Sequence, residues 1–117
     1  MLVAAAAIAF LIGIVHSVLG ERYILIRLFR RDNLPKIFGS DWFTKRTLRF
    51  AWHLTTIAWW GYGALLLSPM NRDAVLTIVA GVFLVHGILA FAGSNGRHLA
   101  WIAFFAIAAL SWLAISA

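Results

Sequence analysis

The chain consists of four long apolar stretches separated by shorter polar segments. The stretches cover residues 1–20, 50–68, 74–93 and 99–117, and none of them contains Asp, Glu, Lys or Arg. A helix needs about 20 residues to cross ~30 Å of hydrocarbon, so this pattern predicts four membrane-spanning helices. The first stretch lacks the positive leading region of a secretory signal, and we expect it to be a retained helix.

The connections between the stretches predict how the helices are arranged. Short turns join the second, third and fourth stretches, which makes these helices antiparallel neighbours. Ser40 or Asp41 is expected to cap the second helix, and Asp73 the third. The sequence therefore predicts one all-α domain, an integral membrane four-helix antiparallel bundle. Its first loop contains either an extension of the first helix or an interfacial helix.

Composition supports a membrane protein. The chain is 63% hydrophobic and 12% charged, whereas soluble domains are roughly 45–50% apolar and about 25% charged. There is no cysteine, which removes disulfides and thiolate ligands from consideration.

The basic residues predict the orientation. Most lie between the first two stretches: Arg22, Arg27, Arg30, Arg31, Lys36, Lys45, Arg46 and Arg49. Under the positive-inside rule this loop is cytoplasmic and both termini are outside, in a bacterial inner membrane. The loop is expected to contact anionic lipids. It lacks the interleaved aromatic residues of a stacking platform, so no nucleic-acid partner is expected.

Histidines are the candidate functional residues. His16, His53 and His86 lie inside the first three stretches, and His98 opens the fourth. Counting along ideal helices puts the first three roughly 20–24 Å from the outer boundary, at a common depth. An imidazole in hydrocarbon needs hydrogen-bond partners, so such residues usually face inward and often mark a functional path.

Three uses of these imidazoles remain open. In the first, His16 and His86 are the axial ligands of haem b and His53 is a third ligand or a supporting donor. In the second, His16, His53 and His86 together bind a transition metal. In the third, the imidazoles carry a proton or hold a quinone headgroup.

A structural role is the alternative for each histidine. Two nearby hydroxyls are available as partners, because Ser17 adjoins His16 and Thr56 lies one turn from His53. Glu21 is about 140° around the helix from His16 and points more nearly with Ser17. We expect Glu21 to pair with Arg97 or His98 at the inner boundary.

Several enzyme classes are disfavoured. The chain has no Walker or dinucleotide glycine pattern and no HExxH, and no acid lies within a span to complete a Ser-His-Asp set. Its length and helix count resemble those of small multidrug resistance transporters, but that family works through a Glu embedded in the first helix. Besides a redox protein, two functions therefore remain: an accessory subunit of a larger membrane complex or homo-oligomer, and a small proton-coupled carrier.

Overall fold

The computed structural model describes residues 1–117 and is entirely helical, which confirms the all-α prediction. Its elements are α1 (Leu2–Leu19), the π-helix η1 (Gly20–Leu25), α2 (Ile26–Leu28), α3 (Trp42–Leu67), α4 (Arg72–Ser94) and α5 (Ala100–Ser116). The first three form one continuous helix, Leu2–Leu28. The apolar start of the first loop thus extends the first helix and does not form a separate interfacial helix.

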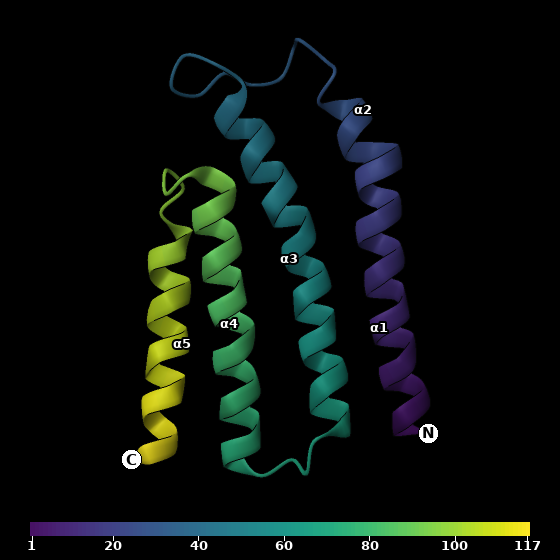
Figure 1. Ribbon diagram of the computed structural model, residues 1–117, viewed down its shortest axis with the longest axis vertical. Helices are drawn as coiled ribbons and strands as arrows, with labels where there is room; N and C mark the ends of the chain where they lie inside the picture. The colour runs from purple at the N-terminus through teal and green to yellow at the C-terminus, as the bar shows by residue number, and fades with distance from the viewer.

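The helices lie side by side in a row, in the order α1, α3, α4, α5 (Figure 1). Helix packing is confined to consecutive members of this row, and α1 does not pack against α4 or α5. Short turns make neighbours antiparallel, as predicted, but they do not require the row to close. The expected four-helix membrane bundle is therefore not confirmed, and the helices form an open array in which α3 separates α1 from α4.

Small residues set the spacing within the row. Gly13 and Gly20 of α1 and η1 lie against tryptophans of α3, and Gly61 of α3 lies against Val82 of α4. Only 14 of the 117 residues are buried, because an open row encloses little volume. Most large apolar side chains on α1 and α5 are consequently exposed.

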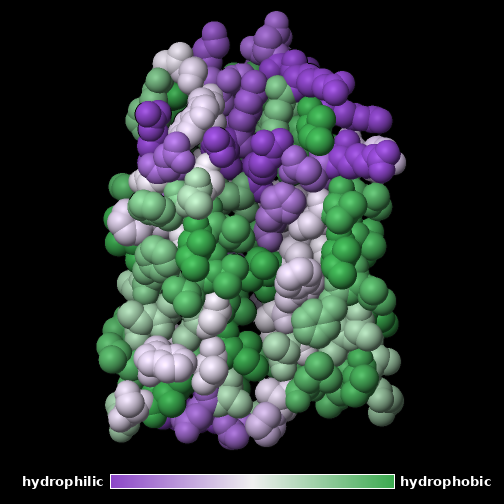
Figure 2. Space-filling view, viewed as in Figure 1, coloured by the Kyte–Doolittle hydropathy of each residue, from purple (hydrophilic) through white to green (hydrophobic).

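Polar side chains gather at one end of the array. Figure 2 shows them around the loop of residues 29–41, above a broad apolar band. We call this end, with its arginines and lysines, the basic end. The two chain termini lie at the opposite end (Figure 1). Two helices, Leu2–Leu28 and Arg72–Ser94, are long and apolar enough to cross a membrane, and Ala100–Ser116 is a shorter apolar helix.

The helix caps differ in part from the prediction. Asn71, not Asp73, caps α4, because its side-chain oxygen accepts the Ala74 N–H at 2.8 Å. At the start of α3, the Asp41 side chain makes no capping bond. The Ser40 hydroxyl accepts the Trp42 N–H at 3.3 Å instead.

Candidate functional site

Close packing of α1 on α3 creates the setting of the site. A Cβ on Gly20 would overlap the Trp52 indole, and one on Gly13 would lie 2.5 Å from the Trp60 Nε1. The two indoles donate to α1 carbonyls, Trp52 to His16 at 3.0 Å and Trp60 to Phe10 at 3.1 Å. These tryptophans therefore fix one helix against the other.

A chain of hydroxyl and imidazole groups crosses this interface. Ser17 Oγ lies 2.7 Å from Thr56 Oγ1 and 2.9 Å from His53 Nδ1. The buried Thr56 hydroxyl also donates to the Gly13 carbonyl at 3.2 Å. The predicted hydroxyls are thus used, but Ser17 bonds His53 on the facing helix and not its neighbour His16.

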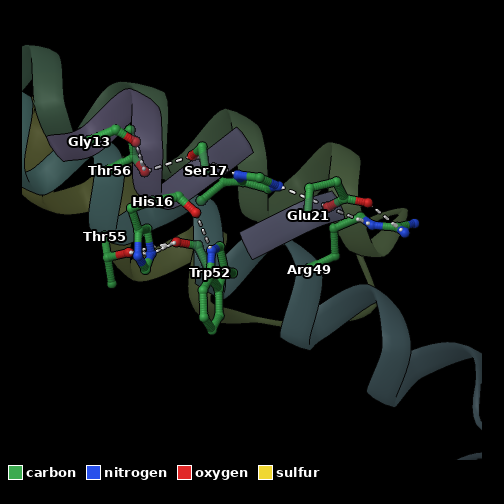
Figure 3. A network of polar contacts seen from close by, with 9 residues as sticks. Gly13, His16, Ser17, Glu21, Arg49, Trp52, Thr55 and Thr56 are labelled. Carbon is green, nitrogen blue, oxygen red and sulfur yellow. Dashed lines mark hydrogen bonds and ion pairs between the residues drawn. The ribbon is translucent and has the colours of Figure 1, made fainter. Parts of the chain in front are cut away.

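A charged group continues the chain toward the basic end (Figure 3). His53 Nε2 lies 3.2 Å from Glu21 Oε2. Arg49 approaches the same carboxylate in a fork, with Nη2 2.8 Å from Oε1 and Nε 3.3 Å from Oε2. A carboxylate can only accept, so the Nε2 of His53 carries the hydrogen. Glu21 does share the Ser17 side of its helix, as predicted, but it pairs with Arg49 and His53 and not with Arg97 or His98.

His16 belongs to a second cluster on the other side of the same interface. The Thr55 hydroxyl donates to the Trp52 carbonyl at 2.6 Å, so it accepts from His16 Nε2 at 2.7 Å. Nε2 therefore carries a hydrogen, and Nδ1 of a neutral His16 has a free lone pair. The imidazole stacks on the Trp52 ring with centroids 4.5 Å apart. A groove lined by His16, Trp52, Trp59 and Tyr23 lies beside it.

The π-helix η1 begins next to these two clusters. It runs from Gly20, whose N–H bonds within α1, to Leu25, and it contains Glu21. Single π turns inside α-helices are rare and often occur at functional sites. Here the wider turn contains the carboxylate that pairs with His53 and Arg49.

The hydrogen-bonded series of Ser17, His53 and Glu21 resembles the serine, histidine and acid of a hydrolytic triad. Such a set was not expected from the sequence, because no acid lies within an apolar stretch. The spacing is suitable, at 2.9 Å for Ser17 to His53 and 3.2 Å for His53 to Glu21. Acyl transfer also requires free N–H donors to stabilise an oxyanion. Ser17 lies inside α1, where backbone N–H groups are bonded to helix carbonyls. The arrangement is therefore better suited to moving a proton than to nucleophilic attack.

The remaining histidines lie elsewhere. His86 is buried on α4, where its Nδ1 donates to the Val82 carbonyl at 2.8 Å. His98 stacks on Phe43 at 5.6 Å, and its Nδ1 accepts the Ala100 N–H at 3.3 Å. Both bonds are local to their own segment of the chain, so neither of them joins the histidine to the next helix.

The predicted histidine groupings are not formed. His16 is on α1 and His86 is on α4, and these two helices do not pack against each other, so the two residues do not face each other as a haem b pair within one chain. No group of three His, Cys, Asp or Glu residues is arranged to hold a metal. The cause is the open row, which places α3 between α1 and α4.

Sequence reasoning missed Arg49, Trp52 and Thr55. A helical spacing was the available signal, because Arg49 lies four residues before His53, and Trp52 lies three residues before Thr55 and four before Thr56. Intrahelical spacing alone, however, does not show which partner helix these residues meet.

The chain matches no protein-family model, no curated protein and no solved structure.

Proposed function

We propose that the protein is an integral membrane protein that binds and exchanges a proton at the α1–α3 site, in the cytoplasmic half of the bilayer. In this proposal, α1, α3, α4 and α5 all span the membrane, with the basic end in the cytoplasm. Figure 2 shows an apolar band below a hydrophilic end. The sequence places most of the arginines and lysines between residues 22 and 49, which form that end, and this asymmetry supports the orientation.

The observation that carries the proposal is the continuous chain Thr56, Ser17, His53, Glu21. Successive polar atoms are 2.7, 2.9 and 3.2 Å apart. Hydroxyl and imidazole groups can both donate and accept, so a proton can pass along such a chain by reversal of its hydrogen bonds. The carboxylate of Glu21 compensates the charge that His53 gains.

Two complete hydrogen-bond patterns are available to the chain. With His53 neutral, Thr56 donates to Ser17, and Ser17 donates to His53 Nδ1. With His53 protonated, Nδ1 donates to Ser17, Ser17 donates to Thr56, and Thr56 donates to the Gly13 carbonyl. Every hydroxyl is satisfied in both patterns, so the gain of a proton does not leave a polar group without a partner.

The chain has a closed end and an open end. Thr56 is buried and its last acceptor is the Gly13 carbonyl, which cannot pass a proton on. Glu21 and His53 are both 30% exposed near the basic end. The arrangement therefore favours uptake and release on the cytoplasmic side over conduction across the membrane, with His53 as the exchanging group.

Infrared difference spectroscopy of the reconstituted protein between about pH 5 and pH 8 tests this proposal. We expect paired imidazole and carboxylate bands, with the imidazole bands lost in His53→Gln and the carboxylate band lost in Glu21→Gln. His98→Gln is the matched control, because His98 does not contact the chain. Imidazole bands that persist unchanged in His53→Gln would overturn the proposal.

A second candidate function, an accessory subunit or homo-oligomer, is favoured by the open row. The row exposes large apolar side chains, such as Ile8, Leu84 and Trp112. In lipid these faces can contact either acyl chains or other helices. Native mass spectrometry from a mild detergent distinguishes these cases: a stable dimer or larger assembly supports the second function, whereas a monomer at all concentrations contradicts the homo-oligomer.

A further inference from the structure

A groove between α3 and α4 opens at the basic end and reaches the imidazole of the proposed proton site. The residues that line this groove are Arg46, Arg49, Phe50 and His53 of α3 and Leu89, Ala92 and Gly93 of α4. Its exposed surface is almost wholly apolar, and two arginines and an imidazole are among the residues that border it. His53 is the residue that the groove and the Ser17 chain have in common.

The groove has more positive than negative charge. Arg46 has no carboxylate partner, and its guanidinium lies 5.4 Å from the centre of the Trp42 ring. Arg97 lies over the same ring at 4.9 Å and likewise forms no ion pair. Arg49 shares the single carboxylate of Glu21 with His53. An anion can therefore enter beside Arg46 without displacing an existing ion pair.

We propose that this groove binds the phosphomonoester headgroup of an anionic membrane lipid. Arg46 and Arg49 supply N–H donors whose planar fork matches phosphate oxygens. The first carbons of the lipid chains lie against Phe50, Leu89 and Ala92. A monoester fits better than a diester, because its second negative charge is matched by the second arginine and by a protonated His53.

The proposal deepens the proton-exchange function and rests on it for the role of His53. A phosphate bound at Arg46 lies beside the Arg49–Glu21 ion pair without breaking it, and its negative charge favours the protonated form of His53. Lipid binding and proton uptake are therefore expected to occur together. The two arginines by themselves would still hold an anionic lipid if His53 did not exchange a proton.

Native mass spectrometry of the full chain in a neutral detergent tests the site. The probes are phosphatidic acid, phosphatidylglycerol and phosphatidylcholine with identical acyl chains. We expect phosphatidic acid to bind about tenfold more tightly than phosphatidylglycerol, the equivalent of one additional charge-assisted hydrogen bond. Phosphatidylcholine should bind more weakly than either. Equal retention of the two anionic lipids would overturn the proposal, because it would indicate charge attraction without a monoester site.

Two pairs of variants locate the binding. Arg46→Gln should abolish the preference, whereas Arg30→Gln removes the same charge from the loop and should preserve it. Ala92→Leu should fill the groove and weaken binding while every charge remains, and Ala106→Leu, at an exposed position of α5, should not. Unchanged binding in both Arg46→Gln and Ala92→Leu would overturn the site. Circular dichroism confirms that each variant is helical.

The failure of this proposal and that of the proton-exchange proposal can be told apart. Loss of the imidazole bands in His53→Gln, together with no lipid preference, would reject only the lipid site. A monoester preference that survives His53→Gln would reject the role of His53 in binding and leave the two arginines as the site.

Discussion

Trp52 and His16 are joined at three points across the α1–α3 interface. The indole Nε1 donates to the His16 carbonyl at 3.0 Å, the His16 Nε2 lies 3.3 Å from the Trp52 carbonyl, and the two rings stack with planes only 2° apart. This pair holds the helices together immediately beside the Ser17 chain, so its loss should loosen the site as well as the fold.

Trp52→Phe keeps an aromatic ring for stacking but removes the indole donor. We expect a loss of about 0.5–1.5 kcal/mol in the free energy of unfolding, the usual value of one hydrogen bond. Thermal unfolding in detergent measures this loss. Trp112→Phe is the control, because Trp112 is 61% exposed. Equal destabilisation by the two variants would contradict the role of the indole bond.

Gly20→Ala places a Cβ against the Trp52 indole, which cannot move without losing its bond to His16. Overpacking of this kind typically costs about 1–3 kcal/mol. Gly81→Ala is the matched control, since a Cβ there meets nothing within 4 Å. The helix propensity of alanine should make that variant neutral or slightly more stable. If Gly20→Ala were as stable as Gly81→Ala, the close approach of η1 to Trp52 would be wrong.

The sequence predicted most of the helices but not the relations between them. Apolar length identified the helices, and helical periodicity correctly grouped Glu21 with Ser17. The pairing of Ser17 with His53 depends on the α1–α3 alignment, which Gly13, Gly20 and the indoles determine through shape. An apolar pattern does not encode this shape, because lipid and a neighbouring helix require the same apolar surface.

The same limitation explains the histidine prediction. Counting residues gives depth along a helix axis, and the structure keeps His86 opposite the part of α3 between Phe50 and Gly61, near the level of His16. Counting gives no lateral position. A closed bundle would have brought His16 and His86 together, whereas the open row separates them by α3.

A cofactor measurement therefore checks the row directly. We expect the monomeric protein, purified from a haem-replete host, to show no Soret band from a His16/His86 pair. His16 is on α1 and His86 is on α4, and these helices do not pack against each other. The measurement is a UV-visible spectrum with metal analysis of the monomer fraction. A Soret band that both His16→Ala and His86→Ala abolish would contradict the open arrangement.

The orientation of the array is open to a test with reporter fusions. Both termini lie at the end opposite the basic loop (Figure 1), so all three positions can be compared in one protein. An enzyme reporter that is active only outside the cytoplasm should be active at either terminus and inactive when inserted at the exposed Asn33. The reverse pattern would overturn the proposed orientation.

Charge should determine the orientation of the protein, because the positive-inside rule counts Lys and Arg near the ends of the spans. Replacing Arg27, Arg30 and Arg31 by Gln should increase the fraction of molecules inserted in the reverse orientation. Arg72→Gln, at the opposite end of the array, should not increase this fraction.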